Sequence, residues 1–234
     1  MVVDRADRIG SLFYWLGRHH RQQVQLATKL VAENATFVDV GANIGEFSIS
    51  VALQHRDAAV VAFEPNSKVR HLLCRNRDLN DLSNLHVFPD AVGDVNGSRM
   101  LYQSDDTMLS SLTAFSDRHQ PTETVSVVTL DTLVAEQKLK SIDVLKIDVE
   151  GNEFNVLRGA VNAIRRFQPH IIVEVNSITS VAAGFGSADL LACMQELRYR
   201  FRVWKSDAWE LAGAQDIPDS CDVWAEPLES SAAP

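Results

Sequence analysis

The segment from Phe37 to Gly45 constrains the fold of this chain more than any other. It reads FVDVGANIG, an apolar run with one acid that ends in two glycines, and a helical pattern follows it. A strand, a glycine turn and a helix in this order begin a doubly wound α/β sheet, which binds small ligands at such a turn. The dinucleotide pattern G-x-G-x-x-G is absent, because Asn43 and Glu46 stand where two of its glycines would be. The turn therefore disfavours a nicotinamide-dependent oxidoreductase and suits a cationic nucleoside that carries an amino acid, with S-adenosylmethionine (SAM) as the obvious candidate.

The rest of the chain alternates between apolar strands and amphipathic helices. We expect strands at 37–40, 59–63, 85–88, 142–147, 171–175, 201–205 and 222–226, and helices at 45–54, 66–79, 152–166 and 187–198. Continuous apolar strands separated by helices predict a Rossmann-like α/β fold, in which helices cover both faces of a mostly parallel sheet. Residues 99–130 interrupt this rhythm with two further strands, at 100–103 and 125–129, around a polar loop.

The chain is long enough for one domain with a substantial core. We expect that domain over residues 35–227, preceded by a helical segment at 1–34 and followed by a disordered tail at 228–234. Apolar residues recur at helical spacing in the N-terminal segment, so it either packs on the sheet or caps the ligand cleft. Its histidines, His19 and His20, are interpreted as surface residues without a chemical role.

Composition restricts the partners and the compartment. The formal net charge of −9 disfavours nucleic acid as a partner, because proteins that bind nucleic acid carry clustered Lys and Arg. The three cysteines lie far apart and form no C-x-x-C pair, which indicates reduced thiols. No apolar run approaches the ~20 residues that span a bilayer, and the N-terminus lacks the pattern of a signal peptide. We therefore expect a cytoplasmic protein without a transmembrane segment.

Acids end the first three predicted strands. Glu64 lies 23 positions after Gly41, close to the ~20-residue spacing at which an acid meets ribose hydroxyls, and the proline after it stops the strand. The carboxylate of Asp90 can accept a hydrogen bond from an adenine amino group, while the backbone at Ala91 reads the edge of the ring. Asp39 either orients the glycine turn or binds the ammonium group of the ligand.

A second polar group follows the next two predicted strands. In the segment DVLKIDVEG, Asp148 and Glu150 stand at the C-terminal end of the strand, where they could act on a substrate. Glu174 and Asn176 share one face at the same edge of the sheet. Asp148, Glu174 and Asn176 offer only oxygen atoms, which suits Mg²⁺, and the alternative is a hydrogen-bonded cluster without metal. Glu153 is interpreted as a residue that stabilises the N-terminus of the following helix.

These motifs resemble the FkbM-type SAM-dependent methyltransferases. The similar segments are DVGANIGEFS, FEP, DAVGD, SSL at 110–112, VTLDTL, DVLKIDVEGNEFNVLRGA and IIVEVN, over roughly residues 37–176, with a weaker match at DVWAEP. The KIDVEG segment and the LRGA that follows it are the most specific. The resemblance implies a Rossmann-like class I SAM-dependent methyltransferase fold. Its sheet would have seven strands, parallel except for one C-terminal strand, with SAM at the C-terminal strand ends.

The resemblance also implies site residues and a reaction. Asp39, Gly41, Asn43 and Gly45 would line the methionine end of SAM, Glu64 the ribose, and Asp90 with Ala91 the adenine. The acceptor would be a hydroxyl of a sugar, glycolipid or polyketide-like natural product. Asp148, assisted by Glu150, would take the proton of that hydroxyl during in-line methyl transfer, or would hold a metal ion that acidifies it. The alternatives are an RNA or protein methyltransferase, which the acidic charge disfavours, and a non-catalytic SAM-binding module, which the complete motifs disfavour.

Overall fold

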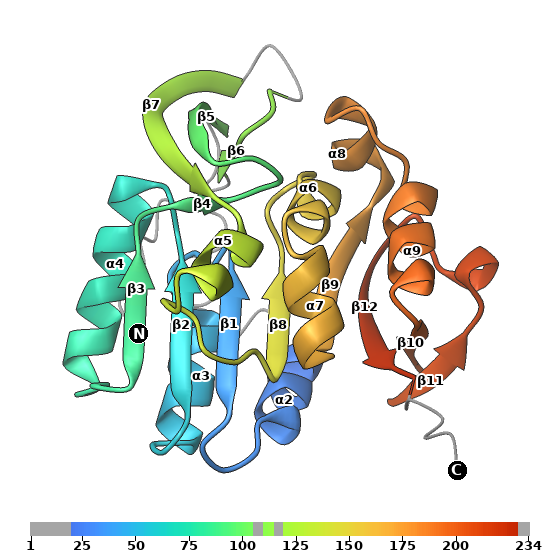
Figure 1. The fold of residues 1–234 in the computed structure, drawn as a ribbon, viewed down its shortest axis with the longest axis horizontal. Coiled ribbons are helices and arrows are strands. Elements are labelled where there is room, and N and C mark those ends of the chain that lie inside the picture. The colour runs from blue at the N-terminus through green and yellow to red at the C-terminus, as the bar shows by residue number, and fades with distance from the viewer. Residues whose placement is uncertain (1–19, 105–109, 115–118, 229–234) are drawn as a thin grey trace.

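The computed structural model describes residues 20–104, 110–114 and 119–228, and shows a large sheet with helices on both faces (Figure 1). The strands of this sheet are β1 Thr36–Val40, β2 Ala59–Phe63, β3 Leu85–Phe88, β8 Val144–Ile147, β9 His170–Asn176, β10 Tyr199–Lys205, β11 Ala208–Ala212 and β12 Ser220–Pro227. Their order across the sheet is β11-β10-β12-β9-β8-β1-β2-β3. The chain leaves β1 toward β2 and β3 and later returns to β8 and β9 on the other side, so the strand order reverses beside β1.

The predicted α/β fold with a mostly parallel sheet is confirmed. The five strands from β9 to β3 are all parallel to their neighbours. At the other end β12 runs antiparallel to β9 and β10, and β11 runs antiparallel to β10. The sheet therefore has eight described strands and two reversed ones, where seven and one were expected. Strand β11 escaped prediction because most of its side chains are exposed, so its sequence lacks a buried apolar pattern.

Helices pack on the two faces of the sheet. They are α2 Arg21–Leu30, α3 Glu46–Gln54, α4 Ser67–Leu79, α5 Leu130–Ala135, α6 Glu153–Arg158, α7 Val161–Phe167, α8 Ser177–Ala182 and α9 Ser187–Glu196, with a short 3₁₀ helix at Ala214–Asp216. Strand β1 is buried along its whole length, and its side chains alternate between the faces. Val38 and Val40 join the apolar core beneath α6, α7 and α9, and Phe37 joins the core beneath α2 and α3.

The helix predicted at 152–166 is divided into α6 and α7. Gly159 lies at the division, where a Cβ atom would stand 1.9 Å from the carbonyl oxygen of Gly93. The backbone of the segment after β4 therefore approaches this point too closely for any side chain. This contact joins residues far apart in the sequence, which explains why the helical pattern of the segment did not reveal the division.

A second, smaller sheet lies above the C-terminal edge of the main sheet (Figure 1). It consists of β4 Ala91–Val92, β5 Gly97–Ser104, β6 Ser110–Ser111 and β7 His119–Val128, in the order β4-β7-β5-β6. The two strands expected within 99–130 correspond to β5 and β7, which pair antiparallel. The small sheet thus covers the end of the main sheet at which α/β folds bind ligands.

Of the expected N-terminal helical segment, the structure describes α2 and the residues around it. Leu26 and Ala27 of α2 pack into the same apolar cluster as Phe47 of α3. Residues 1–19, including His19, and the tail beyond residue 228 lie outside the described residues. None of the helices that the structure describes is long and apolar enough to cross a membrane.

Candidate functional site

The glycine turn after β1 is built by contacts with β2 and β8. Gly41 has a φ of +77°, and a Cβ atom at this position would lie 1.8 Å from the carbonyl oxygen of Asp148. The backbone N–H groups of Gly41 and Ala42 both donate to the carbonyl of Phe63, at 3.1 and 3.0 Å. Asn43 also adopts a left-handed conformation, which asparagine tolerates better than most residues. Only a glycine therefore fits position 41, where three strand ends meet.

A buried ion pair supports the turn from below. Asp39 is fully buried and accepts a hydrogen bond from the Ser48 hydroxyl. The Lys146 Nζ atom lies 3.3 Å from Asp39 Oδ1 and donates to the Gly41 carbonyl at 2.7 Å. Burial by itself lowers the pKa of Lys146, but Asp39 and Asp148 outweigh it, so that this pKa is raised and the side chain stays charged. Of the two roles considered for Asp39, its burial supports the orientation of the turn.

Asp39 and Gly45 do not line the cleft, although both were expected at the methionine end of the ligand. Gly45 has a φ of +96° and begins α3. A Cβ atom on Gly45 would lie 2.4 Å from a methyl carbon of Leu73 in α4, so this glycine allows two helices to pack. Asp39 and Gly45 therefore support the conformation of the turn without lining the cleft, whereas Gly41 and Asn43 do line it.

Glu64 is held at the end of β2 by backbone donors. Its two carboxylate oxygens accept hydrogen bonds from the N–H groups of Asn43 and Asn66, each at 2.9 Å. Burial raises the pKa of Glu64 to about 7, despite the opposing effect of these N–H groups and of Lys146. A carboxylate offers about four acceptor positions, so the two that remain can receive ribose hydroxyls. Asp90, half-buried, and Ala91, buried, also line the cleft.

The cleft has a volume of about 400 Å³, which is in the range of small-molecule sites. Other residues line the cleft although no role in ligand binding was expected for them, among them His20, Glu46, Phe47, Phe63, Leu101 and Asn152. The small sheet supplies Ser110, Ser111 and Leu112, which the sequence analysis noted only as part of a family motif. The Ser111 hydroxyl donates to the carbonyl of Glu150 at 2.8 Å, and Asn66 donates to the Ser110 hydroxyl at 2.8 Å. The small sheet is thereby fastened across the cleft.

His20 differs from its interpretation as a surface residue, because it lies on the cleft wall. Its backbone N–H donates to Glu46 Oε1 at 2.9 Å, and its ring Nδ1 lies 3.0 Å from Glu46 Oε2. Burial lowers the pKa of His20, whereas the hydrogen bond to Glu46 and the charge of Asp148 raise it. The raising effects together outweigh burial, so the pKa of His20 is higher than usual. A single histidine before a helix gave no signal of this contact, since Glu46 is 26 positions away.

The cleft is also lined by three acids from the region of β8 and β9. Asp148 follows β8, Glu150 lies in the next turn with a φ of +55°, and Glu174 projects from β9. Burial and the neighbouring charge of Asp148 raise the pKa values of Glu150 and Glu174. Glu153 is almost completely buried, and its Oε1 atom accepts hydrogen bonds from the N–H groups of Val149, at 2.9 Å, and Gly151, at 3.1 Å. These hydrogen bonds to Glu153 stabilise the turn between β8 and α6.

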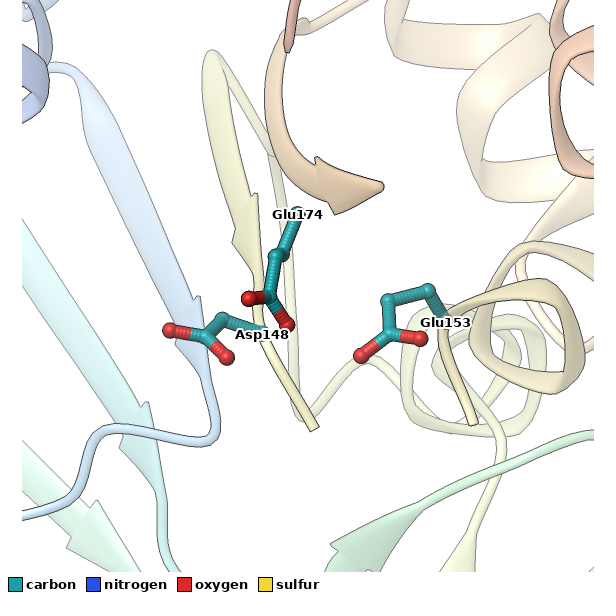
Figure 2. A group of neighbouring side chains, drawn as sticks. All are labelled: Asp148, Glu153 and Glu174. Atoms are coloured by element: carbon teal, nitrogen blue, oxygen red, sulfur yellow. The ribbon is translucent and has the colours of Figure 1, made fainter. Parts of the chain in front are cut away.

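The structure brings two of the three predicted metal ligands together. Asp148 and Glu174 lie close together, and Glu153 is the third member of the group. One carboxylate oxygen of each residue lies within 4.8 Å of the other two (Figure 2). Asn176, the third predicted ligand, lines the cleft but caps α8: its Oδ1 accepts hydrogen bonds from Ile178 and Thr179 N–H groups at 3.2 and 3.4 Å. The oxygen of Asn176 is therefore already engaged, and Glu153 takes its place in the cluster.

The chain is similar in sequence to known methyltransferases. A model described as the methyltransferase FkbM domain matches residues 39–201. The 31-O-demethyl-FK506 methyltransferase FkbM of Streptomyces tacrolimicus is 30% identical over 170 residues, which cover 60% of this chain and 65% of that protein. Methyltransferase 1 of Beauveria bassiana is 26% identical over 164 residues, again covering 65% of the relative. The hexuronic acid methyltransferase AglP of Haloferax volcanii is 28% identical over 192 residues, covering 80% of this chain and 73% of the relative.

Solved structures share the fold. Methyltransferase FkbM from Methylobacillus flagellatus KT is 20% identical with a TM-score of 0.52, and the match covers 84% of this chain and 45% of that one. A SAM-dependent O-methyltransferase from Thermotoga maritima is 14% identical with a TM-score of 0.53, covering 95% of this chain and 72% of the other. These likenesses confirm the predicted class I SAM-dependent methyltransferase fold.

Proposed function

This chain belongs to the family of FkbM methyltransferases, and from that premise we propose that it transfers a methyl group from SAM to a hydroxyl of a small molecule or glycan. The observation that carries the proposal is the cleft at the C-terminal ends of β1, β2 and β8. Gly41, Glu64, Asp90 and Asp148 all line this cleft. The names of two relatives specify acceptors with hydroxyl groups, FK506 at its 31-O position and a hexuronic acid.

In the proposed complex SAM lies along the turn. Gly41 and Asn43 contact the methionine end, with the Gly41 carbonyl already held by Lys146. The carboxylate of Glu64 accepts the ribose hydroxyls, and Asp90 and the backbone of Ala91 bind the adenine. The oxygen atoms of Glu64 keep their position without the ligand because two backbone N–H groups hold them. This preorganisation lowers the entropy cost of binding.

The sulfonium of SAM supplies an activated methyl group, so the protein has to align the acceptor and accept its proton. Alignment contributes up to about 7–11 kcal/mol in favourable cases. Asp148 and Glu150 both line the cleft. In the proposed reaction Asp148 takes the proton of the hydroxyl, assisted by Glu150. A divalent cation, when bound, would acidify the hydroxyl, and the predicted ligands Asp148 and Glu174 present the oxygen atoms that such a cation prefers.

Calorimetric titration with SAM, and with NAD as the control ligand, tests the first half of the proposal. We expect saturable binding of SAM and none of NAD. A methyl-transfer screen against uronic acids, glycosides and hydroxylated macrolides, read as formation of S-adenosylhomocysteine, tests the second half. Absence of SAM binding would refute the proposed function. Transfer to RNA or protein, without transfer to any of these hydroxyl compounds, would refute the proposed acceptor class.

A further inference from the structure

Three carboxylates from three separate elements converge beside the cleft. Asp148 follows β8, Glu174 lies in β9 and Glu153 is the first residue of α6. Their nearest oxygen atoms all lie within 4.8 Å of one another, and in the view of Figure 2 the Glu174 carboxylate lies between those of Asp148 and Glu153. Like charges at this separation repel, and the repulsion is relieved either by protonation of a carboxylate or by a positively charged group bound between them. The cluster is therefore a candidate site for a cation.

Buried oxygen atoms in the cluster lack a partner. Among the residues that the structure describes, neither Glu153 Oε2 nor Glu174 Oε2 has a hydrogen-bond donor, and both atoms are inaccessible to solvent. Glu153 is only 1% exposed. Its other oxygen, Oε1, is fixed by the N–H groups of Val149 and Gly151, and Figure 2 shows the Glu153 carboxylate directed toward Glu174 and Asp148. A buried carboxylate oxygen without a hydrogen-bond donor is costly unless something compensates it, and a cation bound beside this carboxylate would do so.

Lys146 does not fill this role. Its Nζ atom lies 3.6 Å from Asp148 Oδ2, but it is closer to Asp39 and donates to the Gly41 carbonyl at 2.7 Å. The ammonium group is thus engaged beneath the glycine turn, on the side of Asp148 that faces Asp39. The oxygen atoms of Glu153 and Glu174 remain uncompensated by it.

We propose that Asp148, Glu153 and Glu174 bind one divalent cation of the oxygen-preferring class, Mg²⁺, Mn²⁺ or Ca²⁺. All three donors are carboxylates, the ligand type that this class selects. Two oxygen atoms on opposite sides of Mg²⁺ lie about 4.2 Å apart, since each Mg–O distance is about 2.1 Å. Adjacent oxygen atoms on the same ion lie about 3.0 Å apart. The oxygen atoms of the cluster lie within 4.8 Å of one another, so the three side chains would move closer together when the cation binds. Glu153 thereby replaces Asn176 of the predicted set, because the Asn176 oxygen caps α8.

The cation site deepens the proposed methyl transfer, and its catalytic use rests on that function. Asp148 and Glu174 line the cleft, while Glu153 lies behind them at the start of α6. A cation held there would lie beside the cleft, next to Asp148 and Glu174. It could bind the acceptor oxygen directly and make its proton easier to remove.

Titration of the full chain with MnCl₂, followed by electron paramagnetic resonance of free Mn²⁺, tests the site without SAM or acceptor. We expect one Mn²⁺ per chain. Glu153→Gln is the sharpest variant, because the amide oxygen can still accept from Val149 and Gly151 while an NH₂ group replaces Oε2. We expect this variant to weaken Mn²⁺ binding by at least the ~10–100-fold that loss of a supporting residue costs at metal sites.

Asp222→Asn is the matched control. Asp222 is paired with Glu174 across β12 and β9 and accepts a hydrogen bond from Gln23, but it is not part of the three-carboxylate cluster. Removing its charge should change Mn²⁺ affinity far less than Glu153→Gln. Should Glu153→Gln fail to fold, as judged by circular dichroism, Glu174→Gln removes the second unpartnered oxygen and gives the same comparison.

Two results would overturn the inference. One is the absence of saturable Mn²⁺ binding to the unaltered chain. The other is Mn²⁺ binding that Glu153→Gln and Glu174→Gln weaken no more than Asp222→Asn does. SAM titration of the same preparation separates this inference from the proposed function, because a chain that binds SAM but not Mn²⁺ refutes the cation site alone. A chain that binds Mn²⁺ but not SAM refutes the proposed function and leaves the site in place.

Discussion

Replacement of Gly41 by alanine is the most direct test of how the turn is built. The change places a Cβ atom 1.8 Å from the Asp148 carbonyl oxygen, whereas real Cβ contacts are essentially never below 3.0 Å. The two backbones must therefore separate by about 1.2 Å. That movement acts on the end of β8, where the Asp148 N–H donates to the Val40 carbonyl at 3.1 Å. Asp148 itself would be displaced from the cleft wall.

Two energies contribute to the expected destabilisation. A side chain in the left-handed region costs about 1–2 kcal/mol, and overpacking against neighbouring atoms typically adds about 1–3 kcal/mol. The free energy of unfolding of Gly41→Ala should therefore fall by about 2–5 kcal/mol. Gly184→Ala is the matched control: Gly184 has a φ of +90°, but nothing lies within 4 Å of its added Cβ atom. It should cost only the backbone contribution of about 1–2 kcal/mol.

Urea unfolding of both variants and calorimetric titration with SAM measure these effects. We expect Gly41→Ala to be less stable than Gly184→Ala and to lose SAM binding, whereas Gly184→Ala keeps the SAM affinity of the unaltered chain. If Gly41→Ala is no less stable than the control and binds SAM equally well, the contact between the turn and β8 does not restrict this position.

Three further predictions concern the charged groups. Because the pKa of Glu64 is raised to about 7 and ribose hydroxyls bind its ionised form, SAM affinity should fall about tenfold from pH 8 to pH 6; Glu64→Gln should bind SAM weakly and lose this dependence in calorimetric titrations. Lys146→Met leaves Asp39 buried without its ion pair and should lower the free energy of unfolding by roughly 3–5 kcal/mol in urea titrations, less when combined with Asp39→Asn. Asp148→Asn should reduce turnover by about 10²–10⁴-fold with little change in the Kd of SAM, and near-normal turnover would rule out its role as base.

The sequence correctly predicted which residues gather at the cleft when those residues directly follow a parallel strand. Gly41, Asn43, Glu64 and Asp90 all line one cleft, because each follows a parallel strand and such strands end at the same edge of a sheet. Their roles toward SAM stay predictions until a ligand is measured. Each of these strands could be recognised from its own segment of sequence, because a strand that is buried on both faces of the sheet is a continuous apolar run. The residue that follows each strand could then be identified.

Side-chain partners were less predictable. His20 was interpreted as a surface residue, but Glu46 holds it on the cleft wall across 26 positions of sequence. Glu153 was interpreted as a residue that stabilises the N-terminus of its helix, and it does lie in the first turn of α6. Its burial, and its position beside Asp148 and Glu174, were not predicted. Such contacts depend on the angle and depth at which elements pack, and no local pattern records either quantity.

The sequence by itself determined the order of strands and helices, the glycine turn and the edge at which polar residues gather. It did so because alternation, helical spacing and turn chemistry are local properties of the chain. Only the tertiary structure decided that Asp39 supports the turn from below, that the small sheet covers the cleft, and that Glu153 rather than Asn176 completes the acidic cluster. These outcomes arise where segments distant in sequence compete for the same buried space, and packing and hydrogen bonding between them select the result.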